Sequence, residues 1–164
     1  MNELPLDLES PRWRELAQAF GSAEDVPRLL GALVTESGAR ERDELWFGVW
    51  ATLCTDGTVF TAAYAAAPHL LRITEEQGVA ERAMAVHVVT EVEIARHRLG
   101  APAIPDDLVA AYAHAVESLP AVVASLATVP WNRPTALVMA AALLAGKRQP
   151  TMARAVLAMG GAEQ

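Results

Sequence analysis

Cysteine is the scarcest informative residue in this chain. The single one, Cys54, has no second cysteine with which to form an internal disulfide, which excludes a disulfide-stabilised scaffold. It lies in an apolar segment, and we therefore expect a buried structural thiol and not a reactive one.

Long apolar runs are also missing. The longest covers residues 136–146, whereas a helix needs roughly 20 such residues to cross a bilayer. The N-terminal residues are acidic and lack both the basic part and the apolar part of a signal peptide. We therefore expect a cytoplasmic protein that does not enter a membrane.

Sequence signatures of catalysis are absent as well. The chain contains no glycine-rich phosphate-binding loop and no serine nucleophile elbow. Its histidines and acids do not supply the three or four closely grouped ligands that a metal ion requires. We expect no cofactor, and the balance of these observations is against an enzyme.

Acidic residues are abundant and unevenly placed. The net charge is −7, and residues 1–50 carry ten acids against five bases, whereas residues 101–164 carry four of each. Nucleic-acid binding is disfavoured, because a basic stripe supplies most of its affinity. A protein partner with a basic surface is favoured, since complementary fields speed encounter. The alternative is a solvated surface that only maintains solubility.

The composition predicts helices. Hydrophobic residues make up 52% of the chain, and alanine, the strongest helix former, is about a fifth of it, whereas isoleucine and tyrosine, which strands prefer, are rare. No segment alternates apolar and polar residues with period two, so we expect one all-α domain over residues 1–164. Serine, proline and glycine signals divide it into about nine helices. These cover residues 11–21, 22–36, 42–54, 58–77, 80–99, 105–118, 120–129, 132–145 and 150–160.

Residues 45–71 are the most informative segment. They are expected to form two apolar helices joined by a tight turn at residues 55–58, and Pro68 should kink the second helix. Alanines coat that helix, so that neighbouring helices can approach it on more than one side. Antiparallel helix pairs at a spacing of roughly 40 residues are typical of HEAT-type α-solenoids. We therefore expect a HEAT-like αα-superhelix of about four helix pairs.

Residues 53–70, LCTDGTVFTAAYAAAPHL, resemble a segment of uncharacterised bacterial HEAT-repeat-like proteins. In those proteins the turn usually reads His-Gln-Gly-Thr-Val-Tyr, followed by small residues and a proline. Residues 57–59 match this pattern, whereas residues 55–56 replace the His-Gln pair and Phe60 replaces the tyrosine. The resemblance implies a helical-repeat fold and no established activity. A ligand bound by that His-Gln pair would not be bound here.

Two histidine–glutamate pairs lie on the helix expected at residues 80–99. His87 and Glu91 are four residues apart, as are Glu93 and His97, but the two pairs point to different sides and cannot share one metal ion. We expect Glu93 and His97 to form a solvated pair. His87 and Glu91 border an apolar stripe and should be half-buried.

An alternative function follows from that second pair. His87 and Glu91, with Trp50 and Tyr64, are the residues we would expect to line the site of a small helical ligand-binding protein or enzyme. The competing interpretation is that the histidine is a core residue with a satisfied hydrogen bond. The tryptophan lies on an apolar helical stripe, where a core position is the competing interpretation.

Our leading hypothesis is a protein-binding module of the HEAT-like type. It would be an immunity, antitoxin or scaffold protein that acts by occlusion and needs no catalytic residues. The candidate partner contacts are Asp56 in the tight turn, His69 and Arg72 on the polar side of the helix at residues 58–77, and Trp131 in a loop. The partner itself should have a basic surface and should not be a nucleic acid.

Overall fold

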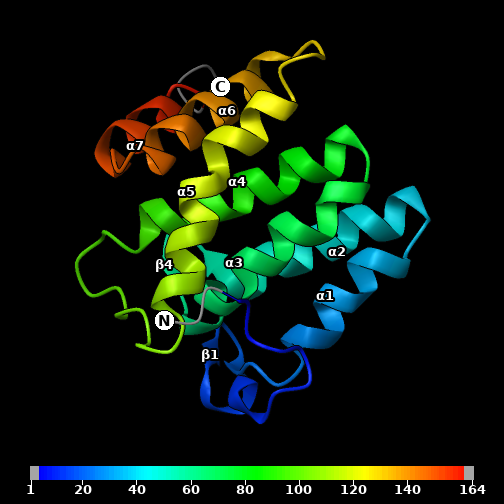
Figure 1. The fold of residues 1–164 in the computed structure, drawn as a ribbon, viewed down its shortest axis with the longest axis vertical. Coiled ribbons are helices and arrows are strands. Elements are labelled where there is room, and N and C mark those ends of the chain that lie inside the picture. The colour runs from blue at the N-terminus through cyan, green and yellow to red at the C-terminus, as the bar shows by residue number, and fades with distance from the viewer. Residues whose placement is uncertain (1–3, 161–164) are drawn as a thin grey trace.

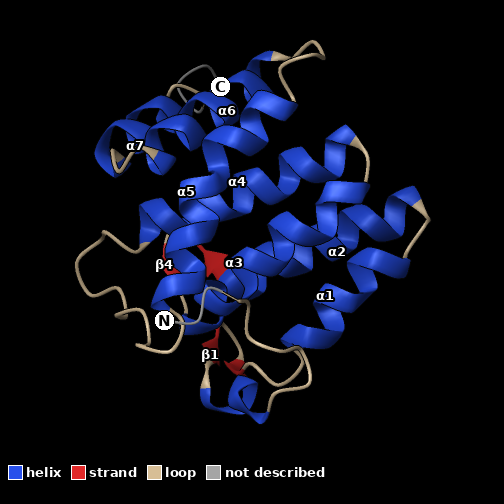
Figure 2. Ribbon diagram, in the orientation of Figure 1, coloured by secondary structure: helices blue, strands red, loops and turns tan. Residues whose placement is uncertain are grey.

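Helices dominate the computed structural model, which describes residues 4–160 (Figures 1 and 2). The described residues form seven α-helices, two short 3-10 helices and two two-stranded hairpins. The α-helices are α1 (Val26–Thr35), α2 (Ala39–Leu53), α3 (Thr61–Ile73), α4 (Val79–Ala95), α5 (Val109–Ser125), α6 (Arg133–Gly146) and α7 (Pro150–Ala158). The remaining elements are η1 (Pro11–Glu15), η2 (Thr74–Glu76), β1 (Ala17–Gln18), β2 (Gly21–Ser22), β3 (Cys54–Thr55) and β4 (Thr58–Val59). The prediction of a predominantly helical protein is confirmed.

The prediction of about nine helices is wrong at the N-terminus. The segment expected to form the first helix is instead η1 followed by the β1–β2 hairpin, in which Gly21 has a φ of 125°. Ser10 caps η1 by accepting a hydrogen bond from the backbone N–H of Arg12, so the start signal was real but the helix is a single turn. The helix expected from Ser22 begins only at Val26.

The expected sixth and seventh helices are one helix. α5 continues through Pro120, although proline removes a backbone hydrogen bond there. Packing against α6 compensates: a Cβ placed on Gly146 would lie only 2.5 Å from Cδ of Pro120, so glycine allows the two helices to cross closely at this point. Tertiary packing thus overrides a local helix-breaking signal.

α4 is the central helix of the molecule (Figure 1). It contacts α3 on one side and α5, α6 and α7 on the other, while α1 packs against α2 and α3. Within residues 4–160 no helix combines the length and the apolarity needed to cross a bilayer.

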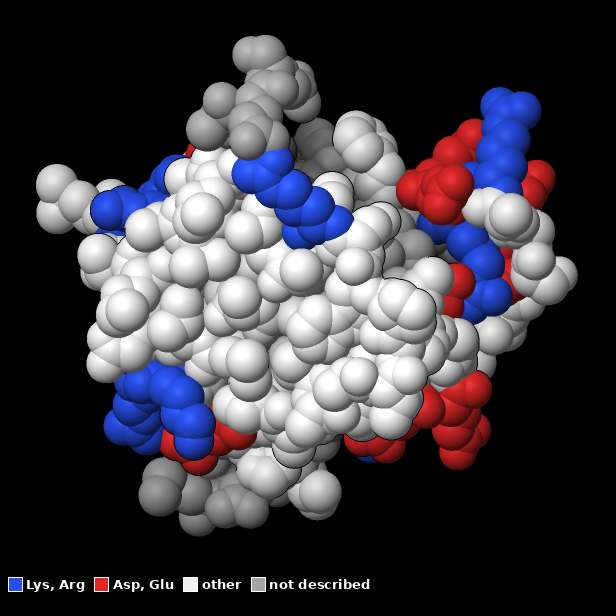
Figure 3. All heavy atoms as spheres, turned by 90° about the horizontal axis from the view of Figure 1, so that it is seen from above, with Lys and Arg blue, Asp and Glu red and all other residues white. Residues whose placement is uncertain are grey.

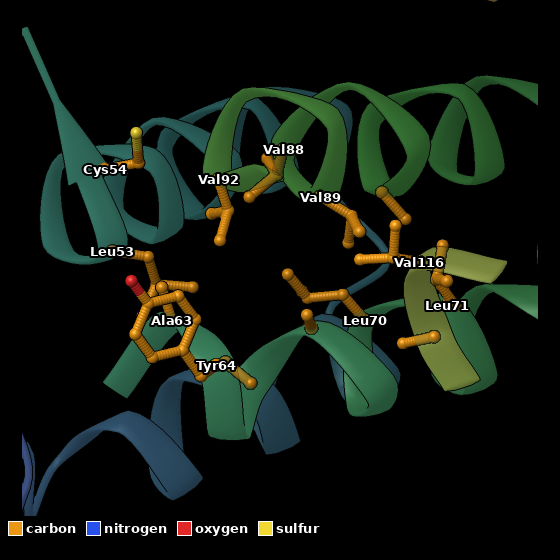
Figure 4. Packing of buried hydrophobic residues seen from close by; sticks show 14 of the residues in the cluster. Leu53, Cys54, Ala63, Tyr64, Leu70, Leu71, Val88, Val89, Val92 and Val116 are labelled. Atoms are coloured by element: carbon orange, nitrogen blue, oxygen red, sulfur yellow. The ribbon is translucent and has the colours of Figure 1, made fainter. Parts of the chain in front are cut away.

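The alanine-coated face of α3 lies in the core. Its alanines are at most 1% exposed, and they are Ala62, Ala63, Ala65, Ala66 and Ala67. Small side chains allow α1, α4 and α5 all to pack against α3, as the composition predicts. Figure 4 shows Tyr64 and Leu70 of α3 facing Val88 and Val92 of α4. Burial of each such large side chain contributes about 1.5–3 kcal/mol.

The tight turn predicted between the two apolar helices is confirmed, with a short hairpin built into it. β3 pairs with β4 through Cys54–Val59 and Thr55–Thr58. The two central residues, Asp56 and Gly57, have φ values of 50° and 71°, as a two-residue hairpin with a type I′ turn requires. Aspartate tolerates this left-handed conformation better than most residues do, which suits it to the place where the resembling proteins have glutamine.

Candidate functional site

A groove of about 500 Å³ lies between α2 and α4. Its α2 wall consists of residues three, four and seven positions apart, which share one face of a helix. Its lining residues are Asp43, Trp46, Phe47, Trp50, Ala51, Thr55, Asp56, Ala80, Glu81 and Met84. We call this the α2–α4 groove, and it has the size of a small-ligand or peptide site.

Three aromatic side chains, Trp46, Phe47 and Trp50, line the α2–α4 groove. Trp46 is buried, and its indole Nε1 donates a hydrogen bond of 2.8 Å to Oε2 of Glu81. Trp50 is half-buried, and its ring meets His87 edge-on, with 4.5 Å between the ring centroids. Phe47 is 76% exposed, which is a large apolar surface for a side chain beside acidic residues. Trp46 is therefore held by burial and a hydrogen bond, and Trp50 packs against His87, whereas the phenylalanine is open to solvent.

Carboxylates give the groove its charge. Glu81 is neutralised locally, because Nε of Arg42 lies 3.0 Å from its Oε1. Asp43 and Asp56 are exposed, and neither carboxylate forms an ion pair with any residue that the structure describes. A groove lined by charge of one sign raises the local concentration of opposite charge. The groove is thus suited to a cationic ligand.

His87 and Glu91 lie beside the groove. Their side chains are 26% and 27% exposed, with 3.7 Å between Nε2 of His87 and Oε1 of Glu91. The prediction of half-burial is confirmed. His87 contacts Trp50, so the structure brings together these three of the four residues of the alternative site.

Tyr64, the fourth residue of that alternative site, lies elsewhere. It is fully buried, its hydroxyl donates a hydrogen bond of 2.8 Å to the carbonyl oxygen of Pro102, and its ring meets Tyr112 edge-on. Burial raises the pKa of Tyr64 to about 12. It is a neutral core residue and does not line the α2–α4 groove.

The partner-contact candidates are scattered. His69 is 2% exposed, so its expected place on the polar surface is wrong: its Nε2–H donates a 2.7 Å hydrogen bond to the carbonyl oxygen of Leu6, and its ring lies near Trp13. Trp131 is half-buried, and its Nε1 donates to the carbonyl oxygen of Leu126 at 3.0 Å. Arg72 is exposed on α3. Of the four candidates, only Asp56 lines the α2–α4 groove.

Glu93 is the centre of a buried cluster that the sequence did not reveal. It is 2% exposed and accepts two hydrogen bonds from Arg96, at 2.6 and 2.9 Å, and one of 2.9 Å from the hydroxyl of Tyr112. Nε2 of His97 lies 3.1 Å from Oε1 of Glu93. The expected solvated Glu93–His97 pair is therefore wrong, because α5 covers this side of α4 and supplies the tyrosine.

The chemistry of this Glu93 cluster is structural. Burial, and then the neighbouring Glu93 carboxylate, raise the pKa of Tyr112 well above its usual value, so its hydroxyl remains a neutral donor. Both carboxylate oxygens already accept hydrogen bonds. Although a cavity of about 310 Å³ lies beside Glu93, the carboxylate is not free to act as a base.

Cys54 is buried, as predicted, and burial raises its pKa to about 12, which keeps the thiol protonated and unreactive at neutral pH. Residues 4–160 contain no group of three or more His, Cys, Asp or Glu placed to hold a metal ion.

Charged residues avoid one end of the molecule. Figure 3 views the end formed by α5, α6 and α7, where uncharged side chains cover most of the face, and charged side chains gather on the side of α1 and α2. The sequence explains the difference, because Arg133 is the only charged residue between Ser118 and Gly146. The α2–α4 groove belongs to the charge-rich part of the chain.

Asp43, Phe47 and Glu81 are groove residues that the sequence-based predictions did not include. The signal that could have indicated them was the spacing of Asp43, Phe47 and Trp50. It places an acid and two aromatic residues on one helical face. Comparisons of the chain with family models, with curated proteins and with solved structures found no match. The resemblance to HEAT-repeat-like proteins therefore stays a prediction.

Proposed function

We propose that this protein is a protein-binding module that recognises a partner with a basic surface through the α2–α4 groove. The observation that carries the proposal is that two exposed carboxylates with no ion pair among residues 4–160, Asp43 and Asp56, line the same groove as an exposed aromatic residue, Phe47. The excess of acids in residues 1–50 adds long-range attraction toward a basic partner. Nucleic acid, being acidic, would be repelled by the same field.

The proposed mode of action is occlusion. The packing of α1 on α2, α3 on α4, and α6 on α7 supports a HEAT-like stack of helix pairs. Such a stack can cover a partner's active or binding surface without any chemistry of its own. An immunity, antitoxin or scaffold protein of the cytoplasm would work in this way.

Co-purification from the native host tests the proposal. The variant Asp43→Lys/Asp56→Lys reverses the charge of the groove, and Glu9→Lys/Asp106→Lys makes the same charge change at exposed positions outside it. We expect one basic partner to be captured stoichiometrically by the wild type and by the Glu9/Asp106 control, and to be lost from the groove variant. Capture that is equal in both variants would exclude the groove, and no stoichiometric partner at all would exclude the binding module.

A second candidate function is a small-ligand-binding protein or enzyme that uses His87 and Glu91. It is favoured by the edge-on contact of His87 with Trp50, which connects the pair to the wall of the groove. Loss of a ligand or an activity in His87→Ala, with the melting temperature unchanged, would support this function over the first.

A further inference from the structure

We infer that the α2–α4 groove binds an extended, arginine-containing segment of its partner, with one guanidinium group stacked on Phe47 and Trp50 and held by Asp43. This inference rests on the proposed function and adds the chemical class of the ligand. It requires a cation-binding surface, a counter-charge and room for a main chain, and the groove supplies each of them.

The aromatic residues provide the cation-binding surface. A cation is attracted to the face of an aromatic ring, and arginine is the most frequent partner because its planar, weakly hydrated guanidinium can stack there. Phe47 offers its ring to solvent, the Trp46 ring is held by its hydrogen bond to Glu81, and the Trp50 ring packs edge-on against His87. Fixed walls lower the entropy lost when a ligand binds.

The carboxylates provide the counter-charge. Asp43 lies four residues before Phe47, and therefore beside it on the same face of α2. A carboxylate can accept two parallel hydrogen bonds from a guanidinium, which lysine cannot reproduce. Arg42, which precedes Asp43 in the sequence, is already paired with Glu81.

The groove is long enough for a second arginine of an extended peptide to reach Asp56. From Asp43 to the end of α2 at Leu53 the helix rises about 15 Å, and Asp56 follows in the turn. An extended chain covers about 13 Å in four residues and returns to the same side every second residue. Two arginines four residues apart can therefore reach Asp43 and Asp56 together. Arg98 leaves the second carboxylate free, because it donates to the backbone carbonyl of Asp56.

A synthetic peptide tests the inference. The probe is the blocked heptapeptide Ala-Arg-Ala-Gln-Ala-Arg-Ala, and its control replaces both arginines by citrulline, which keeps the shape but removes the charge. In calorimetric titrations at low salt we expect saturable binding of the arginine peptide with a Kd below about 1 mM. The citrulline peptide should bind at least about tenfold more weakly.

Protein variants complete the test. Asp43→Asn and Phe47→Ala should each weaken binding of the arginine peptide about tenfold, and both positions are exposed, so the fold should be retained. The control Glu44→Gln removes the adjacent acid of α2, which pairs with Arg40 and does not line the groove. It should leave the affinity unchanged.

Two outcomes overturn the inference: no saturable binding, or binding that is indifferent to citrulline or to Asp43→Asn. The proposed function fails separately. If the natural partner is lost from Asp43→Lys/Asp56→Lys while the peptide does not bind, the module stands and the arginine inference falls. If the peptide binds as expected but no partner is captured, the groove chemistry stands and the proposed function falls.

Discussion

The α2–α4 groove and the Glu93 cluster are built from the same kinds of residue, yet they differ in how their charges are satisfied. Each combines aromatic rings, carboxylates and an arginine. In the cluster, Arg96, His97 and Tyr112 occupy the oxygens of a carboxylate that is 2% exposed. In the groove, Asp43 and Asp56 are exposed, with no ion pair to any described residue.

This difference predicts a structural role for the Glu93 cluster and underlies the binding role that we propose for the groove. A buried, fully hydrogen-bonded carboxylate has no capacity left for a ligand, and removing a partner leaves an uncompensated charge in the interior. An exposed carboxylate contributes little to stability and retains its capacity for an incoming cation. Stability and binding should therefore respond to mutation in opposite ways at the two places.

The largest expected effect is on stability at the Glu93 cluster. Glu93→Gln leaves the half-buried Arg96 and the buried hydroxyl of Tyr112 beside a neutral amide, and we expect it to lower the free energy of unfolding by about 2–3 kcal/mol, measured by urea denaturation. Glu91→Gln, two residues away on α4 and about one-quarter exposed, should lower it by less than about 1 kcal/mol. Equal losses in the two variants would contradict a structural role for the cluster.

A smaller loss is expected at the turn that carries Asp56. Gly57 has a φ of 71°, and the guanidinium of Arg98 lies where a Cβ would be, so Gly57→Ala should lower the free energy of unfolding by about 1–2 kcal/mol in thermal denaturation. The matched control is Gly31→Ala in α1, where nothing lies within 4 Å of a new Cβ and alanine favours the helix. It should be neutral or stabilising, and a loss as large as that of Gly57→Ala would exclude strain in the turn.

The pH dependence of stability should report on buried His69. Burial lowers its pKa below 6.5, so the unfolded chain binds a proton more readily than the native one below that pH. Stability from this source is fully present above about pH 6.5 and is lost as the pH falls toward the native pKa. We expect His69→Gln to flatten the fall in unfolding free energy between pH 7 and pH 5.

The control for that measurement is His114→Gln, since His114 is exposed on α5. If both variants change the slope equally, the pH dependence does not originate at the buried ring.

The smallest expected effect on stability is in the groove itself. Asp43→Asn should change the free energy of unfolding by less than about 0.5 kcal/mol, because the carboxylate is exposed and has no ion pair within residues 4–160. Thermal denaturation of this variant beside Glu93→Gln gives the comparison directly. A loss near that of Glu93→Gln would mean that Asp43 is a structural residue.

Local patterns predicted much of the architecture. The helical class, the turn around Gly57, the buried Cys54 and the half-buried His87–Glu91 pair all follow from composition and spacing over a few residues. The alanine face of α3 likewise predicted that several helices pack against it. These features depend on interactions close in sequence, which a pattern can represent.

Features that depend on distant packing were not predictable in this way. The continuity of α5 through Pro120 requires Gly146 on another helix, and the burial of Glu93 requires Tyr112, nineteen residues away. His69 is covered by the N-terminal segment around Leu6. The spacing of Asp43, Phe47 and Trp50 indicates a shared helical face, but whether that face stays exposed is set by how α2 and α4 pack.

The four tryptophans allow one measurement to test the central claim. Two indole N–H groups, those of Trp46 and Trp50, lie at the α2–α4 groove, whereas those of Trp13 and Trp131 lie outside it and donate to the backbone carbonyls of Asp7 and Leu126. In ¹⁵N-labelled protein, with each indole signal assigned by Trp→Phe substitution, the arginine heptapeptide is added. We predict that the Trp46 and Trp50 signals shift with saturation while the other two remain. Shifts of Trp13 or Trp131 of equal size, or no shift at Trp46 and Trp50, would contradict recognition of a basic partner by this groove.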